Sequence, residues 1–213
     1  MAESQADLKP VRCFLGVPLD AALAARLPLI MKSELQQTLM QTAPWQKASS
    51  QKATSHTSNP APRMVASGNL HLTLAFLGDQ PLSLIHALRQ ELQSPLSAWP
   101  AFTLHSYSIN AFPDAKSAII ALEFEPLEIF QRLKQTLDVT LQHKGVVVES
   151  RPVRPHITLA RGKRGQRLTL PPIACELELK VNEVCLFESK QGAAGNDYRP
   201  LWSIPLKENA NSL

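Results

Sequence analysis

Two short segments of this chain repeat one pattern: a histidine, an apolar residue, a threonine and an apolar residue. They are His71-Leu72-Thr73-Leu74 and His156-Ile157-Thr158-Leu159, and the second histidine follows the first by 85 residues. In a β-strand, side chains at positions i and i+2 point to the same face. Each segment therefore predicts a strand with one imidazole and one hydroxyl on one face and aliphatic side chains on the other. The spacing predicts two similar halves of one fold, whose motif strands lie near each other.

The pairing of the two segments is what makes the pattern specific. The chain has six histidines and 44% hydrophobic residues, and a matched pair arises by chance with a probability of roughly 0.1–0.2%. The alternative interpretation is two core strands whose His and Thr side chains hydrogen-bond locally. The other four histidines lie in a loop, a predicted helix, a strand without Thr at i+2, and a helix end, and we expect them outside any site: His56, His86, His105 and His143.

Two imidazoles and two hydroxyls around one small polar group suit metal-free acid–base chemistry on a phosphodiester. Opening a cyclic phosphate requires a base for water and an acid for the departing oxygen, and imidazole serves both roles near neutral pH. Threonine hydroxyls donate hydrogen bonds to phosphate oxygens that gain charge in the transition state. A two-histidine metal site is the alternative, but the motif strands carry no Asp or Glu beside the histidines. The chain has no G-x-G-x-x-G or Walker loop, so we expect no metal and no cofactor.

The two motifs, together with further segments of the chain, are similar to those of a known family. The further segments are residues 11–19, 67–70, 76–79, 111–113, 151–155, 160–161, 186–189 and 198–205. With them the chain resembles the two-histidine (2H) phosphoesterases, in particular the bacterial RNA 2′,3′-cyclic phosphodiesterase branch, long described as 2′-5′ RNA ligases. The resemblance implies an α+β, two-lobed fold in which two antiparallel sheets form a central cleft with helices on the outside.

The resemblance also implies an activity and a set of site residues. It implies hydrolysis of RNA 2′,3′-cyclic phosphodiester ends to 2′-phosphomonoesters, with His71 as general acid and His156 as general base; the near symmetry of the motifs leaves the exchanged roles open. Thr73, Thr158 and Arg161 would bind the substrate. In a regular strand Arg161 faces away from His156, so we expect the strand to end or twist by Ala160. Two alternatives stay open: reversible 2′-5′ RNA end-joining, and an RNA-end-binding protein without efficient turnover.

The chain is expected to form one two-lobed catalytic domain over residues 10–207, with a flexible N-terminus (1–9) and a C-terminal tail (208–213). Residues 43–62 are rich in Ser, Ala, Thr, Pro and Gln and lack periodicity, which predicts a disordered insertion loop. Periodicity predicts strands over residues 11–17, 69–77, 101–110, 117–123, 146–149, 155–161, 176–187 and 198–205. It predicts helices over 20–41, 83–92 and 126–142, the first with Asp20 as N-cap and Pro28 as a point of kinking or splitting.

The charge and the cysteine content of the chain indicate which partners and which cellular compartment to expect. The net charge is +4, and basic residues gather around the second motif as a solvated loop or a rim that contacts RNA phosphates: Arg151, Arg154, Arg161, Lys163, Arg164 and Arg167. The three cysteines show no C-x-x-C spacing, which favours a reducing cytoplasm. No apolar run approaches a membrane span. We expect a monomer that acts on RNA 3′ ends or nucleotides with a 2′,3′-cyclic phosphate. Phe112 and Phe187 are expected in the core, with base stacking as the alternative.

Overall fold

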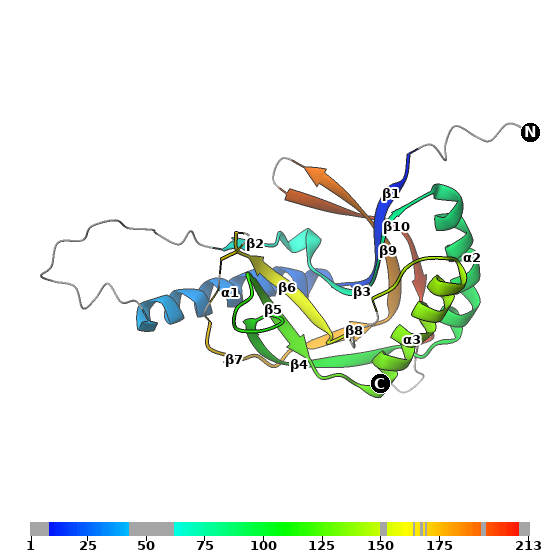
Figure 1. Ribbon diagram of the computed structural model, residues 1–213. Helices are drawn as coiled ribbons and strands as arrows, with labels where there is room; N and C mark the ends of the chain where they lie inside the picture. The colour runs from blue at the N-terminus through cyan, green and yellow to red at the C-terminus, as the bar shows by residue number, and fades with distance from the viewer. Residues whose placement is uncertain are drawn as a thin grey trace, which may run out of the picture.

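The computed structural model describes residues 9–42, 62–149, 153–163, 165–166, 168, 170–192 and 195–208. The predicted N-terminal, insertion and C-terminal segments therefore lie largely outside the described residues. Three α-helices lie among the strands of the first two thirds of the described chain, and strands follow one another after α3 (Figure 1). In chain order they are β1 (Val11–Pro18), α1 (Ala21–Thr42), β2 (Arg63–Met64), the 3₁₀ turn η3 (Ser67–Asn69), β3 (His71–Gln80), α2 (Leu82–Ala98), β4 (Phe102–Ala111), β5 (Ile119–Phe124), α3 (Glu128–His143), β6 (His156–Arg161), β7 (Ile173–Ala174), β8 (Glu178–Val181), β9 (Glu183–Gly192) and β10 (Gly195–Pro205).

Two antiparallel halves make up the sheet. The main strand order is β10-β9-β1-β3-β6-β5-β4-β7, with β2 pairing with β6 and β8 pairing with β4. The halves meet where β3 lies beside β6, through the single residue pair Leu72 and Ile157, and these two strands lie near the centre of Figure 1. The predicted α+β class is confirmed, and its two sheets join edge to edge at the two motif strands.

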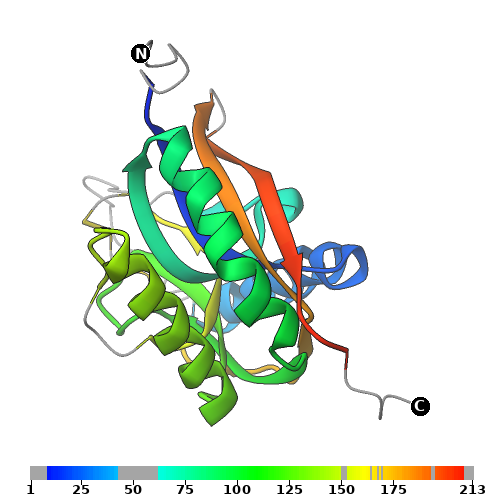
Figure 2. The ribbon, with the colours of Figure 1, turned by 90° about the vertical axis from the view of Figure 1, so that its right-hand side faces the viewer.

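The helices cover the sheet through apolar stripes. Figure 2 shows α2 and α3 side by side on one flank of the molecule. On α3, Leu133, Leu137 and Leu141 recur every four residues and are fully buried, as expected for a helix with one core-facing stripe. The α1 helix starts as predicted, because Asp20 Oδ1 accepts a hydrogen bond from Leu23 N–H at 2.7 Å. It runs without a break through Pro28.

Two predicted strands are wrong. Residues 146–149 form no strand, and Val147 is 91% exposed. The predicted strand over residues 176–187 is two strands, β8 and β9, which are separated at Asn182. The break has a topological reason, because β8 pairs with β4 in the second half while β9 pairs with β1 and β10 in the first. The chain crosses from one half to the other at this residue.

One apolar core connects the two halves. The same cluster of buried side chains includes Leu15 and Leu74 from the first half and Leu122 and Leu159 from the second. All three cysteines are free thiols. Among the described residues, no helix has the length and apolar character that crossing a membrane requires.

Candidate active site

The two motif strands place the five predicted site residues around one cleft. On β3 and β6, the alternating aliphatic residues Leu72, Leu74, Ile157 and Leu159 are buried in the core. The histidines and threonines therefore project from the opposite face, as the alternation of a strand requires. A cleft of about 660 Å³ lies on this face. Its lining includes all five predicted residues, namely His71, Thr73, His156, Thr158 and Arg161.

Both imidazoles are oriented by the same local hydrogen bond. His71 Nδ1 lies 2.7 Å from the carbonyl oxygen of Asn69, and His156 Nδ1 lies 2.9 Å from that of Arg154. A carbonyl oxygen only accepts hydrogen bonds, so Nδ1 carries the proton in both rings. In the neutral form, Nε2 is then the unprotonated nitrogen of each ring. Each motif thus leaves one proton-accepting nitrogen available to a ligand.

A β-bulge brings Arg161 to the side of the histidines. Along β6, Ala160 pairs with Ile120 and Thr158 pairs with Ala121, so Leu159 is an extra residue in the ladder. One extra residue reverses the alternation of side chains beyond it. Leu159 and Ala160 are consequently both buried. Arg161 lines the cleft, although in a regular strand it would lie on the same face as the buried Ile157 and Leu159.

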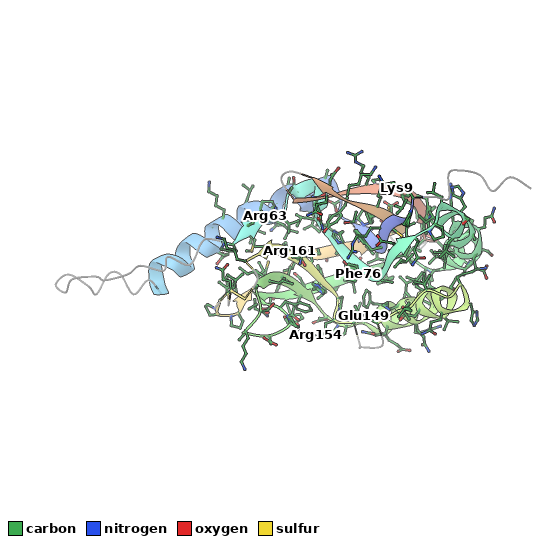
Figure 3. All side chains as sticks on the ribbon, turned by 45° about the horizontal axis from the view of Figure 1, so that its top comes forward. Lys9, Arg63, Phe76, Glu149, Arg154 and Arg161 are labelled. Atoms are coloured by element: carbon green, nitrogen blue, oxygen red, sulfur yellow. The ribbon has the colours of Figure 1, made fainter. Side chains whose placement is uncertain are left out.

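The same reversal occurs in the first motif and exposes Phe76. Residues 71–76 and 156–161 show identical sequences of half-buried, buried and exposed positions, and β3 carries register shifts against β1 over this stretch. Phe76 therefore occupies on β3 the position that Arg161 occupies on β6. Its side chain is 61% exposed and also lines the cleft. In Figure 3, the labelled Phe76 and Arg161 lie over the central strands of the molecule.

His71 is enclosed by aromatic rings. Its ring centroid lies 4.6 Å from that of Phe14 and 4.9 Å from that of Tyr198, and Phe14 stacks in turn on Phe187 at 5.1 Å. Burial among these rings disfavours the imidazolium and lowers the pKa of His71 to about 4. Phe187 belongs to this packed cluster, as the core interpretation predicted, and is 8% exposed.

His156 has a different environment, in which charged groups lie next to the ring. The ring of Phe112 stacks on it with centroids 3.9 Å apart. Glu123 on β5 is its register partner across the strands. Burial lowers the pKa of His156, and the hydrogen bond to the Arg154 carbonyl and the negative charge of Glu123 oppose that shift.

The walls of the cleft are cationic. Three arginines line it, Arg12, Arg63 and Arg161, and the described lining residues include no Asp or Glu. Asn69 ties the β9–β10 hairpin to this wall: its Nδ2 donates to the carbonyl of Asn196 at 2.7 Å, and its Oδ1 accepts from Tyr198 N–H at 3.1 Å. An anion is the ligand that this lining favours.

The predicted basic rim is described only in part. Arg151, Arg164 and Arg167 lie outside the described residues, and Lys163 is exposed. Arg154 is engaged within the protein: Nη1 lies 3.5 Å from Glu123 Oε2, and Nη2 donates to the carbonyl of Pro113 at 2.5 Å. The positive charge of Arg154 is therefore partly neutralised by the carboxylate of Glu123.

The remaining histidines lie away from the cleft where the structure describes them. His86 is exposed on α2, His143 ends α3, and His105 faces Glu178 at 3.9 Å. His56 lies outside the described residues. Within the described part of the chain, no three His, Cys, Asp or Glu side chains are arranged to hold a metal ion.

Several residues of the site were not predicted from the sequence, among them Arg12, Arg63, Asn69, Phe76 and Glu123. Asn69 and Phe76 flank the first motif directly, and the matching of residues 71–76 with 156–161 was a signal that pointed to Phe76. Glu123 had no local signal, because its relation to His156 arises from strand pairing.

Comparisons with known proteins show the family and the fold to which the chain is similar. A model of the 2′-5′ RNA ligase superfamily matches residues 33–193. The RNA 2′,3′-cyclic phosphodiesterase of Escherichia coli is 30% identical over 149 residues, which cover 68% of this chain and 81% of that protein. The protein of the same name from Methanothermobacter thermautotrophicus is 28% identical, over 88% of this chain and 95% of the relative. The solved structure of E. coli LigT complexed with 3′-AMP superposes with a TM-score of 0.70 at 26% identity, over 93% of this chain and 99% of that one.

Proposed function

The chain belongs to the 2′-5′ RNA ligase superfamily, and we propose that it is an RNA 2′,3′-cyclic 3′-phosphodiesterase. It hydrolyses 2′,3′-cyclic phosphate ends of RNA to 2′-phosphomonoesters. The observation that carries the proposal is the pair of His-x-Thr strands that line one cationic cleft, each with its Nδ1 bound to a backbone carbonyl. The relatives from E. coli and M. thermautotrophicus are named RNA 2′,3′-cyclic phosphodiesterases, which supports the same substrate for this chain.

The proposed reaction uses the two histidines in opposite protonation states. Neutral His156 takes a proton from water at Nε2, and the water oxygen forms a bond to phosphorus. The bond from phosphorus to the ribose 3′-oxygen breaks, and protonated His71 donates its Nε2 proton to that oxygen. The product keeps the phosphate on the 2′-oxygen. A DNA end has no 2′-oxygen and cannot form the cyclic ester, which restricts the substrate to RNA.

The low pKa of His71 couples its protonation to substrate binding. With a pKa of about 4, the free ring is neutral near pH 7, whereas the acid role requires the imidazolium. The cyclic phosphate carries one negative charge, and an anion beside a histidine favours the charged form. Binding of the substrate is therefore accompanied by the uptake of one proton from solvent by His71.

The phosphate oxygens have three candidate partners on the same strands. The hydroxyls of Thr73 and Thr158 point to the histidine side of the sheet and donate to non-bridging oxygens. Arg161, brought round by the β-bulge, presents a guanidinium whose paired N–H groups match two oxygens of a phosphate. These contacts strengthen as charge develops in the transition state.

The rest of the cleft suits the 3′ end of an RNA strand. Its volume of about 660 Å³ is within the usual range for small-molecule pockets. Arg12 and Arg63 add positive charge at positions where the flanking backbone phosphate of an oligonucleotide binds. The exposed ring of Phe76 gives a nucleobase a face on which to stack without a strong sequence preference. We therefore propose weak base selectivity and an affinity that falls as salt rises.

Product analysis tests the proposal directly. An oligoribonucleotide that ends in a 2′,3′-cyclic phosphate is incubated with the protein and EDTA, and the product is identified as a 2′- or 3′-phosphate. We expect a 2′-phosphate and undiminished activity in EDTA. A 3′-phosphate, or loss of activity in EDTA, contradicts the mechanism. Addition of an RNA with a free 5′-hydroxyl to the same reaction detects the reverse reaction, 2′-5′ end-joining, by the formation of a longer product.

A second experiment separates the roles of the two histidines. A p-nitrophenyl phosphodiester has a leaving group stable as an anion, so its departure needs no general acid. We expect His71→Ala to lose far less activity on this ester than on the cyclic phosphate, and His156→Ala to lose activity on both. The exchanged pattern would reverse the assignment and leave the two-histidine mechanism in place.

We propose that residues 10–207 act as one catalytic domain and that the protein is a monomer in the cytoplasm. The shared core of the two halves supports the single domain. Sedimentation of the purified protein tests the monomeric state.

A further inference from the structure

A buried carboxylate lies next to one of the two histidines. Glu123 is near the end of β5, and its side chain is 6% exposed. It is the cross-strand partner of His156 in the β5–β6 register. Directly opposite residues of an antiparallel pair present their side chains on the same face, with Cβ atoms about 5 Å apart. The charge of Glu123 is thus held beside the ring of His156.

The carboxylate is fixed in place by side chains of this chain. Asn110 Nδ2 donates to Glu123 Oε1 at 2.9 Å, and Arg154 Nη1 lies 3.5 Å from Oε2. Within the described residues, no hydrogen bond to Oε2 is identified, and the Arg154 guanidinium and the Tyr107 side chain both interact with the carboxylate. Removal of a partner from a buried charge is costly, which makes Glu123 and Arg154 one unit.

This unit contacts His156 through two routes. The backbone carbonyl of Arg154 accepts a hydrogen bond from the Nδ1–H group of His156. The guanidinium of Arg154 lies 4.6 Å from the ring centroid of Phe112, and Phe112 stacks on His156. A displacement of Arg154 would therefore move both the hydrogen-bond acceptor and the ring that orient His156.

The other half of the site lacks this arrangement. His71 is surrounded by Phe14, Phe187 and Tyr198. Its cross-strand partner in the β1–β3 register is the uncharged Pro18, and the titratable groups that act on its ring are Arg161 and His156. The two motifs match in sequence and local geometry, but a carboxylate supports only one of them. The difference corresponds to the two protonation states that the reaction requires.

We propose that Glu123 is a positioning residue that holds Arg154 and stabilises the imidazolium formed on His156 when this histidine takes the proton from water. The inference rests on the proposed function for its role in catalysis, but its effect on His156 is measurable in the free protein. The carboxylate touches no reacting atom. It acts through the charge and the orientation that it gives to the general base.

The charged groups that face His156 come from several elements. Glu123 lies on β5, Arg154 precedes β6, Arg161 ends β6, and His71 lies on β3. Lys134 of α3 and the exposed Glu149 line a smaller adjoining cavity that also contains His156, and Lys134 is paired with Asp138. Among the charged groups of the described residues that shift the pKa of His156, Glu123 is the one anion, and Arg154 is the cation paired with it. The charge of Glu123 raises the pKa of His156, and the charge of Arg154 lowers it.

The test follows from these opposite signs. The titration of each histidine ring is followed by NMR in the wild type, Glu123→Gln, Arg154→Gln and Arg154→Lys, with Glu178→Gln as a control that removes an exposed carboxylate elsewhere. We expect Glu123→Gln to lower the midpoint of His156 by about one unit and to leave His71 unchanged. Arg154→Gln should raise the His156 midpoint, whereas Arg154→Lys and Glu178→Gln should leave it close to the wild type.

Kinetics complete the test. The acidic limb of the kcat/KM profile reports the general base of the free enzyme. In Glu123→Gln this limb should move to lower pH together with the His156 midpoint, and the plateau should fall about threefold because a weaker base accepts the proton less readily.

An unchanged His156 midpoint in Glu123→Gln overturns the proposal, as do shifts of the same sign in Glu123→Gln and Arg154→Gln. If Glu123→Gln does not fold, the Arg154→Gln variant decides: a raised His156 midpoint supports the proposal, and an unchanged or lowered midpoint overturns it. A wild type that titrates as described but does not hydrolyse the cyclic phosphate refutes the proposed function and leaves the electrostatic inference standing.

Discussion

The burial of His71 makes the stability of the protein depend on pH in a defined way. In the unfolded chain its pKa has the ordinary value of 6.5, and in the folded protein burial lowers the pKa to about 4. Between these values the unfolded state binds more protons than the folded state, so acid shifts the equilibrium toward unfolding. The stabilisation by neutral His71 is complete above about pH 7 and declines as the pH falls toward 4.

The size of the effect follows from the two values. The linkage relation gives an upper limit of about 3 kcal/mol for the loss between pH 7 and pH 4. The ring is partly exposed, and solvent screening brings the expected loss from His71 to about 2 kcal/mol. For a protein of this size that is a large fraction of the free energy of unfolding.

Urea denaturation at pH 7, 5.5 and 4 measures this loss in the wild type, in His71→Gln and in His86→Gln. The last variant removes an exposed histidine from α2 and serves as the control. We expect the drop between pH 7 and pH 4 to be about 2 kcal/mol smaller in His71→Gln than in the wild type or the control. Equal drops in all three proteins would refute the argument that burial holds His71 in its neutral form.

Three further predictions concern the cleft. Phe76→Ala should raise KM for a cyclic-phosphate oligonucleotide about tenfold, as loss of one stacking contact implies, while Phe76→Trp should retain the wild-type KM; equal effects of both would exclude stacking. Arg161→Lys should lower kcat/KM by about 10- to 100-fold, because a point charge does not replace two parallel N–H donors, and a wild-type rate would remove Arg161 from the phosphate site. Binding of 2′-AMP at pH 7 should take up protons, measured by calorimetry in buffers of different ionisation enthalpy, and the uptake should shrink in His71→Gln; the same uptake in both would place the proton elsewhere.

The parts of the fold that follow from local pattern were predictable from the sequence. The two motif strands show the alternation of a strand over residues 71–74 and 156–159, and Asp20 precedes α1 as a helix cap. The strand over 176–187 was wrong because the prediction ran through Asn182. The alternation of Leu177, Leu179 and Val181 stops there, since Glu183 is charged, and the two strands on either side pair with different halves of the sheet. Which half of the sheet each strand joins depends on pairing with strands far away in the sequence, and this was not predicted.

The same limit applies to the site. His71, Thr73, His156 and Thr158 were found because each pair lies two residues apart on one strand. The strand parity of Arg161 pointed away from the cleft, and only the resemblance to a family led to the expectation of a twist, which the structure provides as a β-bulge at Leu159. Glu123 stands in a run of apolar residues, and its place beside His156 depends on the register of β5 and β6.

The central claim is that His71 and His156 together open the cyclic phosphate. Its most direct test is kcat/KM for hydrolysis of a 2′,3′-cyclic phosphate by His71→Ala and His156→Ala, with circular dichroism to show that both variants are folded. Each substitution should reduce the rate by about 10²- to 10⁴-fold, the usual effect of the loss of a general acid or base. A folded variant of either kind with wild-type activity would contradict the account.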